Sequence, residues 1–259
     1  MKIAAYQAPL LPSGSFAAIE LIRRRVEWCA AAGVGVLLCP EAVLGGLADD
    51  ARDPAEIAIR VNDGALGRCL APLFSDTVTT IVGFTELAGD HDLFNSAAIF
   101  SQGQVIGVYR KRHPARRSSV YRPGSESPIF KIDGLCFGIM ICNDTNFPDL
   151  GAGLAARGAN VLLVPSNNAL KREFADVVSE TRAVDVACAM RTGLPVIRAD
   201  VAGNLGDRRA FGSSIIVDRD GTILRTGQPF VDDLLVAELE VGTHTPFRTS
   251  VRDWTDPHQ

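Results

Sequence analysis

The sequence predicts an α/β fold built around a mixed sheet. Several short apolar runs, of which residues 34–39 are the clearest, are continuous rather than alternating, as in strands buried on both faces. Segments with apolar residues at helical spacing lie between some of these runs, whereas tight turns join others. Because helical connections join parallel strands and tight turns join antiparallel ones, both kinds of strand pairing are expected.

The first strand is expected over residues 2–7, and a helix over residues 16–32 follows it. That helix has apolar residues on one face, a serine at position 13 or 15 to cap its first turn, and Gly33 beyond its end. Further strands are expected at residues 34–39, 80–84, 97–100, 104–109, 135–141, 161–164, 195–199 and 213–217.

Two junctions, at residues 101–103 and 218–221, predict hairpins. Two more helices are expected, from about residue 149 to 157 and over residues 172–190. The chain has 259 residues, 47% of them hydrophobic, with no repeat and no long linker, so we expect one domain over residues 1–259. From about residue 245 the pattern predicts an irregular tail.

Composition argues against several classes of protein. The net charge of −4 gives no reason to expect nucleic acid or an anionic membrane as partner. No apolar run approaches the roughly 18–20 residues that span a bilayer, and the N-terminus does not resemble a signal peptide. The six cysteines include no C-x-x-C pair, which argues against a zinc site, and in a reducing compartment disulfides are not expected. We therefore expect a cytoplasmic protein.

Three reactive side chains come directly after buried strands. Glu41 follows residues 34–39, Lys111 follows residues 104–109, and Cys142 closes residues 135–141. Loops at strand ends build the sites of layered α/β folds. Taken singly, each residue has an ordinary structural explanation, since strands must leave the core and cysteine is commonly a small buried apolar residue.

The combination predicts a cysteine nucleophile. A thiol must lose its proton before it attacks, a carboxylate can take that proton, and an ammonium can stabilise the thiolate. The same ammonium, with the backbone N–H of Asn143, can hold the oxyanion that forms on a carbonyl or nitrile substrate. A Cys–His hydrolase that pairs Cys142 with His113 is a further possibility. No G-x-S-x-G pattern and no P-loop is present.

These residues resemble the glutamate, lysine and cysteine motifs of the nitrilase, or carbon–nitrogen hydrolase, superfamily. The similar segments are Pro40–Glu41, Tyr109–His113 and Gly138–Asp144. Supporting segments in the same order cover nearly the whole chain, at residues 82–86, 95–97, 122–124, 164–167, 182–185, 211–214 and 220–221.

The resemblance implies a four-layer αββα sandwich with mixed sheets, dimerised across one helical layer. It also implies a mechanism without metal or cofactor, in which Glu41 is the general base, Cys142 the nucleophile and Lys111 the oxyanion-stabilising ammonium. The expected partners are a small-molecule substrate and a second copy of the chain.

The chain departs from the family near Ser119. Amidase-like members carry a second glutamate after the lysine, and here that position falls at Ser119, or at Ser118 if the register slips by one. Glu126 lies beyond the turn and is a weaker substitute. Further candidates for substrate contacts or for support of the central three residues are Ser119, Tyr121, Asp144 and Asn167.

The residues after Cys142 bear on the reaction. Nitrile-cleaving members carry Trp-Glu there, so Asn143–Asp144 favours hydrolysis of an amide or N-carbamoyl compound, with a nitrile as the alternative. Carbamoyl-D-amino-acid enzymes place two arginines next, where this chain has Thr145–Asn146. Arg116, Arg117 and Arg122 are either ligands for an acidic substrate or a solvated basic loop. A catalytically weakened homologue that acts as a binding protein is the rival interpretation, because of Ser119.

Overall fold

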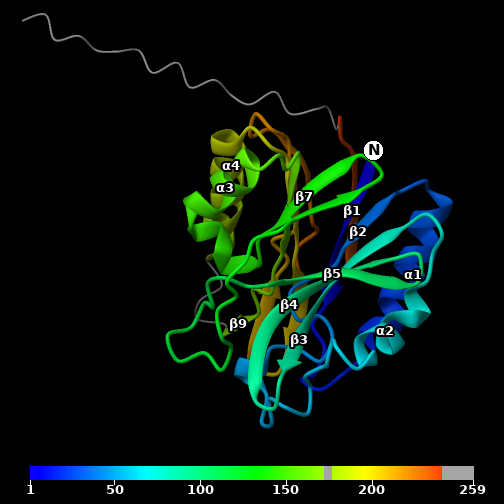
Figure 1. Ribbon diagram of the computed structural model, residues 1–259. Helices are drawn as coiled ribbons and strands as arrows, with labels where there is room; N and C mark the ends of the chain where they lie inside the picture. Colours follow the sequence, from blue (N-terminus) through cyan, green and yellow to red (C-terminus); the bar gives the residue numbers. More distant parts are fainter. Residues whose placement is uncertain (172–176, 241–259) are drawn as a thin grey trace, which may run out of the picture.

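The computed structural model describes residues 1–171 and 177–240, so the tail expected from about residue 245 lies outside the described residues. Two mixed sheets lie face to face, with helices α1 (Ala18–Ala31) and α2 (Ala65–Leu70) outside one and α3 (Pro148–Ala156) and α4 (Val177–Thr192) outside the other (Figure 1). The expected α/β class and αββα layering are confirmed.

The larger sheet holds nine described strands in the order β5-β4-β3-β2-β1-β11-β12-β9, with β15 paired to β1. β1 pairs in parallel with β2 and antiparallel with β15, so the sheet is mixed. Its strands are β1 (Lys2–Pro9), β2 (Val36–Leu38), β3 (Thr79–Ala88), β4 (Asp92–Ser101), β5 (Gln104–Arg110), β9 (Leu170–Lys171), β11 (Val201–Leu205), β12 (Arg208–Phe211) and β15 (Asp233–Glu238).

The smaller sheet has the order β14-β13-β10-β8-β7-β6 in the described part of the chain. β8 pairs in parallel with both β7 and β10, whereas hairpins join β6 to β7 and β13 to β14. Its strands are β6 (Ile129–Ile132), β7 (Leu135–Ile139), β8 (Val161–Pro165), β10 (Val196–Ala199), β13 (Ile215–Val217) and β14 (Ile223–Thr226). Short 3-10 helices are η1 (Ala48–Asp50), η2 (Ala71–Leu73) and η3 (Cys142–Asn146).

Strand alternation separates the apolar cores between the layers. On β1, Ile3 and Ala5 lie in the core between the sheets, whereas Ala4 and Tyr6 lie in the core under α1. On β10, Ile197 lies between the sheets and Val196 lies under α3 and α4. Since side chains alternate between faces along a strand, each sheet serves two cores, which explains the continuous apolar runs.

The expected strands and both hairpins are present, and α1 ends before Gly33, whose φ is +69°. The expected serine cap is wrong. α1 begins at Ala18 with Ala17 as its N-cap, and Ser15 instead accepts a hydrogen bond from the Ala17 N–H before the helix starts. The expected helix over residues 172–190 is described from Val177 to Thr192, and residues 172–176 lie outside the described residues.

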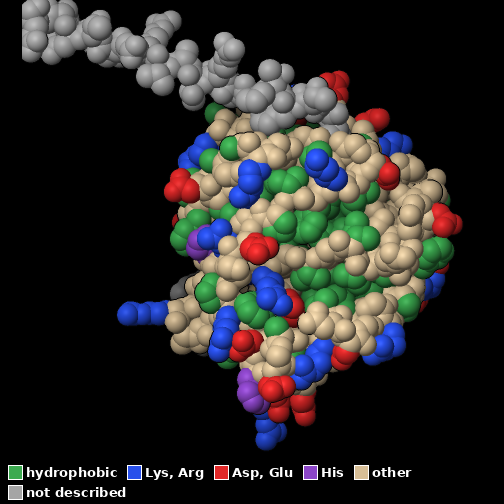
Figure 2. All heavy atoms as spheres, viewed as in Figure 1, with side chains coloured by type: hydrophobic (Ala, Val, Ile, Leu, Met, Phe, Trp, Pro, Cys, Tyr) green, Lys and Arg blue, Asp and Glu red, His purple; other side chains and the backbone are tan. Residues whose placement is uncertain are grey.

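Figure 2 shows hydrophobic side chains near the centre of one face, with positive and negative side chains interspersed around them. This mixture agrees with the small net charge of −4. No helix in the described ranges is long and apolar enough to cross a membrane.

Candidate active site

Glu41 and Lys111 form a buried ion pair. Lys111 Nζ donates to Glu41 Oε1 at 2.5 Å, and the two residues are only 3% and 2% exposed. Asn95 Nδ2 donates to the same oxygen at 2.8 Å, and the backbone N–H of Asn167 donates to Oε2 at 2.9 Å. The carboxylate is therefore paired with an ammonium, oriented on both oxygens and shielded from water. Asn167, a candidate from the sequence, lies in this group.

The loop that carries Glu41 passes close over β3. A Cβ added at Gly83 would lie 2.3 Å from the Pro40 carbonyl oxygen and 2.5 Å from the Ala42 nitrogen. Ala42 has φ +46°, in the left-handed region that favours glycine. The chain thus holds a strained residue beside Glu41 and needs a glycine beneath it. Strain of this kind is characteristic of functional sites.

Cys142 lies on a similar strained turn, with φ +47°, and two residues separate it from the end of the strand β7. It opens η3, whose first hydrogen bond runs from the Asp144 N–H to the Ile141 carbonyl at 3.0 Å. The N–H of Asn143 precedes that bond and belongs to the end of the helix where N–H groups lack helical partners. An N–H at this end of a helix can donate a hydrogen bond to a group outside the helix.

Asp144 holds the turn of Cys142 to the strand of Lys111. Its Oδ2 accepts from the Ile141 N–H at 2.9 Å and from the Tyr109 hydroxyl at 2.8 Å. Its Oδ1 accepts from the His113 N–H at 2.8 Å and lies 3.0 Å from His113 Nδ1. Asp144 is 0% exposed, so it supports the site and does not face a substrate.

His113 is engaged away from Cys142. Its ring stacks on Phe147 with centroids 3.6 Å apart, and its Nδ1 faces Asp144. The polar partner of Cys142 Sγ in the described structure is Asn168 Oδ1, at 3.6 Å. The geometry therefore does not favour the Cys–His alternative.

Asn168 links Cys142 to a second buried aspartate. Its backbone N–H donates to Asp200 Oδ1 at 2.9 Å, and its Nδ2 donates to Asp200 Oδ2 at 3.2 Å and to Ser213 Oγ at 3.0 Å. Asp200 also accepts from the N–H of Ser213 and of Val201. This anchoring turns the amide oxygen of Asn168 toward the thiol.

Charges of both signs act on Cys142. Burial raises the pKa of its thiol to about 12, and the carboxylate of Glu41 adds to this rise, while Lys111 and Arg198 oppose it. Burial lowers the pKa of Lys111, but the charges of Glu41 and Cys142 raise it above its ordinary value. At neutral pH the resting group is therefore a thiol beside a carboxylate and an ammonium, and attack requires a base.

Ser119 and Tyr121 lie outside this group. Ser119 Oγ lies 3.0 Å from both carboxylate oxygens of Asp49, and no described hydrogen bond joins it to Glu41, Lys111 or Cys142. The Tyr121 hydroxyl accepts from the Ala48 N–H at 2.6 Å and pairs with Thr85 Oγ1 at 2.8 Å. Through these hydrogen bonds, both residues connect the loop after Lys111 to the loop after Glu41.

The basic residues of the same loop are not aimed at a substrate. Arg116 forms an ion pair with Asp50, and Arg122 forms one with Asp92. Arg117 is exposed. The solvated-loop interpretation of these arginines fits the structure better than the substrate-ligand interpretation.

Sequence reasoning missed Asn168, Asp200 and Arg198, and it gave Asn95 no role. A signal existed for two of them. Arg198 lies inside a short apolar strand and Asp200 directly after it, and charged residues are almost never fully buried unless they are paired. The partners come from distant segments, so the sequence could flag these residues but not place them.

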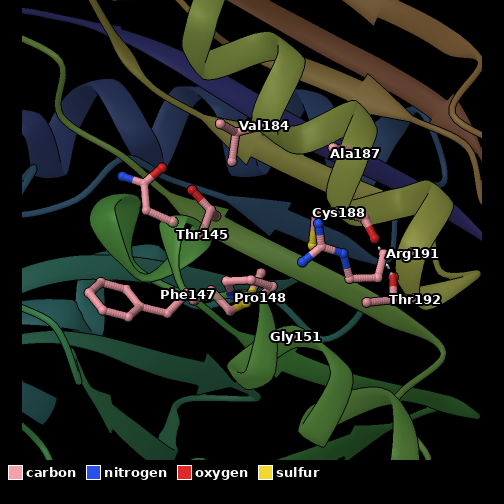
Figure 3. A pocket seen from close by; sticks show the side chains of 11 residues that line it. Thr145, Phe147, Pro148, Gly151, Val184, Ala187, Cys188, Arg191 and Thr192 are labelled. Carbon is pink, nitrogen blue, oxygen red and sulfur yellow. Dashed lines mark hydrogen bonds between the residues drawn. The ribbon is translucent and has the colours of Figure 1, made fainter.

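A cavity of about 260 Å³ opens onto Cys142. Cys142, Asn143, Thr145 and Asn168 line one part of it, and Glu180 and Val184 of α4 line another. Glu41 and Lys111 are buried and are not among the described residues that line it. An adjoining hollow of about 190 Å³ lies between Thr145, Phe147 and Pro148 on one side and Val184, Cys188 and Arg191 of α4 on the other (Figure 3).

The described residues contain no group of three or more acidic, His or Cys side chains that could hold a metal ion.

A family model for carbon–nitrogen hydrolases matches residues 2–249. The chain belongs to the carbon–nitrogen hydrolase family. This hydrolase is 29% identical over 228 residues to a protein from Pseudomonas protegens that is named hydrolase in pqqF 5′ region. The alignment covers 86% of this chain and 77% of the relative. It is 25% identical over 246 residues to deaminated glutathione amidase from Escherichia coli O157:H7, and that alignment covers 89% of this chain and 90% of the relative.

The hydrolase also matches longer proteins. It is 26% identical over 238 residues to a glutamine-dependent NAD(+) synthetase from Xanthomonas campestris, and spans 41% of that relative's length. Among solved structures, a cysteine-to-serine variant of the amidase from Nesterenkonia AN1, of the nitrilase superfamily, aligns with a TM-score of 0.79 at 23% identity. That alignment covers 93% of this chain and 92% of the amidase, and it shows that the fold is shared.

Proposed function

We propose that this hydrolase cleaves a small amide or N-carbamoyl compound through a thioester at Cys142, within one hydrolase domain. The observation that carries the proposal is the buried ion pair of Glu41 and Lys111, whose charges both act on the thiol of Cys142. A carboxylate, an ammonium and a thiol in one water-shielded group are the parts that covalent acyl transfer requires.

In the first half-reaction Glu41 takes the proton from Cys142 as its sulfur attacks the substrate carbonyl carbon. The oxyanion that forms accepts hydrogen bonds from Lys111 Nζ and from the N–H of Asn143. Glu41 then gives the proton to the substrate nitrogen. The C–N bond breaks, ammonia or amine leaves, and the acyl group stays on the sulfur as a thioester.

In the second half-reaction a water molecule attacks the thioester carbon while Glu41 takes one of its protons. The C–S bond breaks, the acid leaves and the proton returns to Cys142. The raised pKa of the thiol, about 12, keeps the resting sulfur protonated at neutral pH, so a base such as Glu41 must take the proton during attack. In one structure of the Nesterenkonia amidase, the acetamide moiety of fluoroacetamide is covalently added at that enzyme's active-site cysteine, which supports a cysteine nucleophile here.

The cavity favours a small substrate without a strongly anionic end. Its volume of about 260 Å³ is below the range of about 300–1,000 Å³ that is usual for drug-sized ligands. Thr145 and Asn146 line it, where a pair of arginines would bind a carboxylate, and the guanidinium of Arg198 is already paired with Asp185. A short amide or carbamoyl compound fits these limits.

Nitrile hydrolysis is the second candidate. A relative from Pyrococcus abyssi that is 28% identical over 213 residues bears the name nitrilase. Cys142 would attack a nitrile carbon with the same base, Glu41, and the same ammonium, Lys111. Asn143–Asp144 after the nucleophile is the feature that favours the amide.

The test is ammonia release from a panel of small amides, ω-amides, N-carbamoyl compounds and nitriles, with wild type and Cys142→Ala side by side. We expect release from at least one amide or carbamoyl compound by wild type and none by the variant. Release that survives in Cys142→Ala would refute the nucleophile. No release from folded wild type would favour a weakened binding homologue, and release from nitriles alone would favour the nitrilase alternative.

We also propose a cytoplasmic homodimer that pairs through the layer of α3 and α4 and has neither nucleic acid nor membrane as partner. Phe147, which lines the hollow of Figure 3, and Met190 of α4 are 41% and 64% exposed, unusually open for large apolar side chains. All six cysteines are free thiols, which suits a reducing compartment. Light scattering of wild type and Met190→Glu tests the dimer: we expect twice the chain mass, reduced in the variant.

A further inference from the structure

A second buried ion pair lies behind Cys142. Arg198 of β10 is 1% exposed and is the largest fully buried side chain among the described residues. Its Nε and Nη2 donate to the two carboxylate oxygens of Asp185 on α4, each at 2.6 Å, and Asp185 is 0% exposed. A buried ion pair is commonly no more stabilising than a pair of apolar side chains of similar volume. Stability alone therefore does not account for this pair.

The guanidinium is connected to the backbone of Cys142. Its Nη2 also donates to Thr145 Oγ1 at 3.2 Å, and Thr145 Oγ1 donates to the carbonyl oxygen of Cys142 at 2.9 Å. That carbonyl belongs to the residue with φ +47°. A strained backbone conformation persists only where its surroundings hold it, and this chain of two hydrogen bonds does so from the core side.

The same guanidinium is connected to the loop of Glu41. Arg198 Nη1 donates to Ser166 Oγ, and the carbonyl oxygen of Ser166 accepts from the Glu41 N–H at 3.2 Å. The next residue, Asn167, donates its N–H to the Glu41 carboxylate. One side chain thus has hydrogen bonds that lead to both Cys142 and Glu41.

We propose that Arg198 is a positioning residue of this hydrolase: held by Asp185, it fixes the turn of Cys142 relative to the loop of Glu41 and sets a permanent positive charge beside the thiol. This rests on the proposed function only for its effect on turnover. Arg198 lines the cavity next to Cys142, and its charge opposes the rise that burial imposes on the pKa of the thiol. The side chain therefore acts by geometry and by charge.

The two actions separate in two variants. Asp185→Leu/Arg198→Met replaces both charges with apolar groups, which avoids leaving one charge buried and unpaired. We expect it to fold, to lose about 100-fold in kcat/KM, and to alkylate Cys142 with iodoacetamide along a pH profile moved to higher pH. Thr145→Val keeps the shape and the charge but removes the hydroxyl. We expect it to lower kcat and leave the alkylation profile in place.

Arg25→Met is the matched control, because it removes the guanidinium of α1 that pairs with Asp232, on the far side of the larger sheet. We expect wild-type kinetics and a wild-type alkylation profile. A folded double variant with both properties of wild type would overturn the proposal. If wild type hydrolyses nothing, the proposed function fails, but the alkylation profiles still decide whether Arg198 acts on Cys142. Thr145→Val with unchanged kcat would overturn the geometric part.

Discussion

Asp144 and Asp49 each hold a loop beside the site, but they do so in different surroundings. Asp144 is 0% exposed and accepts from the backbone of Ile141 and His113 and from the hydroxyl of Tyr109. Asp49 is half-buried and accepts from Ser119 Oγ and the Val120 N–H. The first fixes the turn of Cys142, and the second fastens the loop in which the chain departs from its family.

This difference shows which part of the site is changed where Ser119 replaces the second glutamate of the family. Ser119 points toward Asp49 and shares no described hydrogen bond with the ion pair of Glu41 and Lys111. The ion pair is oriented instead by Asn95 and Asn167, and the nucleophile turn by Asp144. The departure therefore falls in the loosely held part of the site, while the reacting groups have buried support of their own.

The largest effect on the free energy of unfolding is expected from Asp144→Asn. An amide keeps the size but turns an NH₂ group toward N–H and O–H donors, so buried donors lose their acceptor. We expect a loss of about 3 kcal/mol in the free energy of unfolding, since hydrogen bonds to charged groups contribute about 1.5–3 kcal/mol each. Urea denaturation measures it.

Asp149→Asn, an exposed aspartate in the first turn of α3, is the control and should change stability by less than about 1 kcal/mol. Equal losses in the free energy of unfolding would mean that the buried hydrogen bonds of Asp144 stabilise the fold no more than the exposed side chain of Asp149 does.

Glu41→Gln is expected to change the reactivity of Cys142 in opposite directions in two assays. The carboxylate raises the pKa of Cys142, so its removal lowers that pKa and increases the thiolate fraction at any pH below it. Alkylation of Cys142 by iodoacetamide at pH 8 should therefore be faster than in wild type, and its pH profile should move to lower pH.

Ammonia release by Glu41→Gln should fall by about 10²–10⁴-fold, because the general base is gone. Slower alkylation together with slower release would mean that Glu41 acts on Cys142 through structure alone.

The smallest effect is expected from Ser119→Ala. Its hydrogen bond to Asp49 is half-buried, so we expect a loss of less than about 1 kcal/mol in stability. The value of kcat/KM should stay within about threefold of wild type, which corresponds to less than about 1 kcal/mol. If turnover instead falls by about two orders of magnitude, Ser119 takes over the role of the missing glutamate.

An α/β fold with a mixed sheet, most of the strands and two hairpins could be predicted, because buried strands leave continuous apolar runs and tight turns join some of them. β11 and β12 were missed, since Gly203, Asn204 and the pair Arg208–Arg209 interrupt that signal in a short polar hairpin. The N-terminal cap of α1 was misassigned because Ser15 forms a local turn instead.

The three central residues of the candidate site could be predicted, since reactive side chains at strand ends combined with the family resemblance. The arrangement around them could not. Arg198 and Asp185 are 13 positions apart, and Asp200 serves Asn168 from 32 positions away. The pairing of these buried charges depends on the register of β10 against β8 and on how α4 crosses β10. Local sequence patterns predict neither of these.

Rapid-quench mass spectrometry during turnover of the best amide tests the central claim most directly. We expect the mass of wild type to rise by the acyl group less one hydrogen. The adduct should map to Cys142 and form at least as fast as the acid product. Steady release of ammonia with no adduct on Cys142 at any quench time, and with equal release by Cys142→Ala, would contradict it.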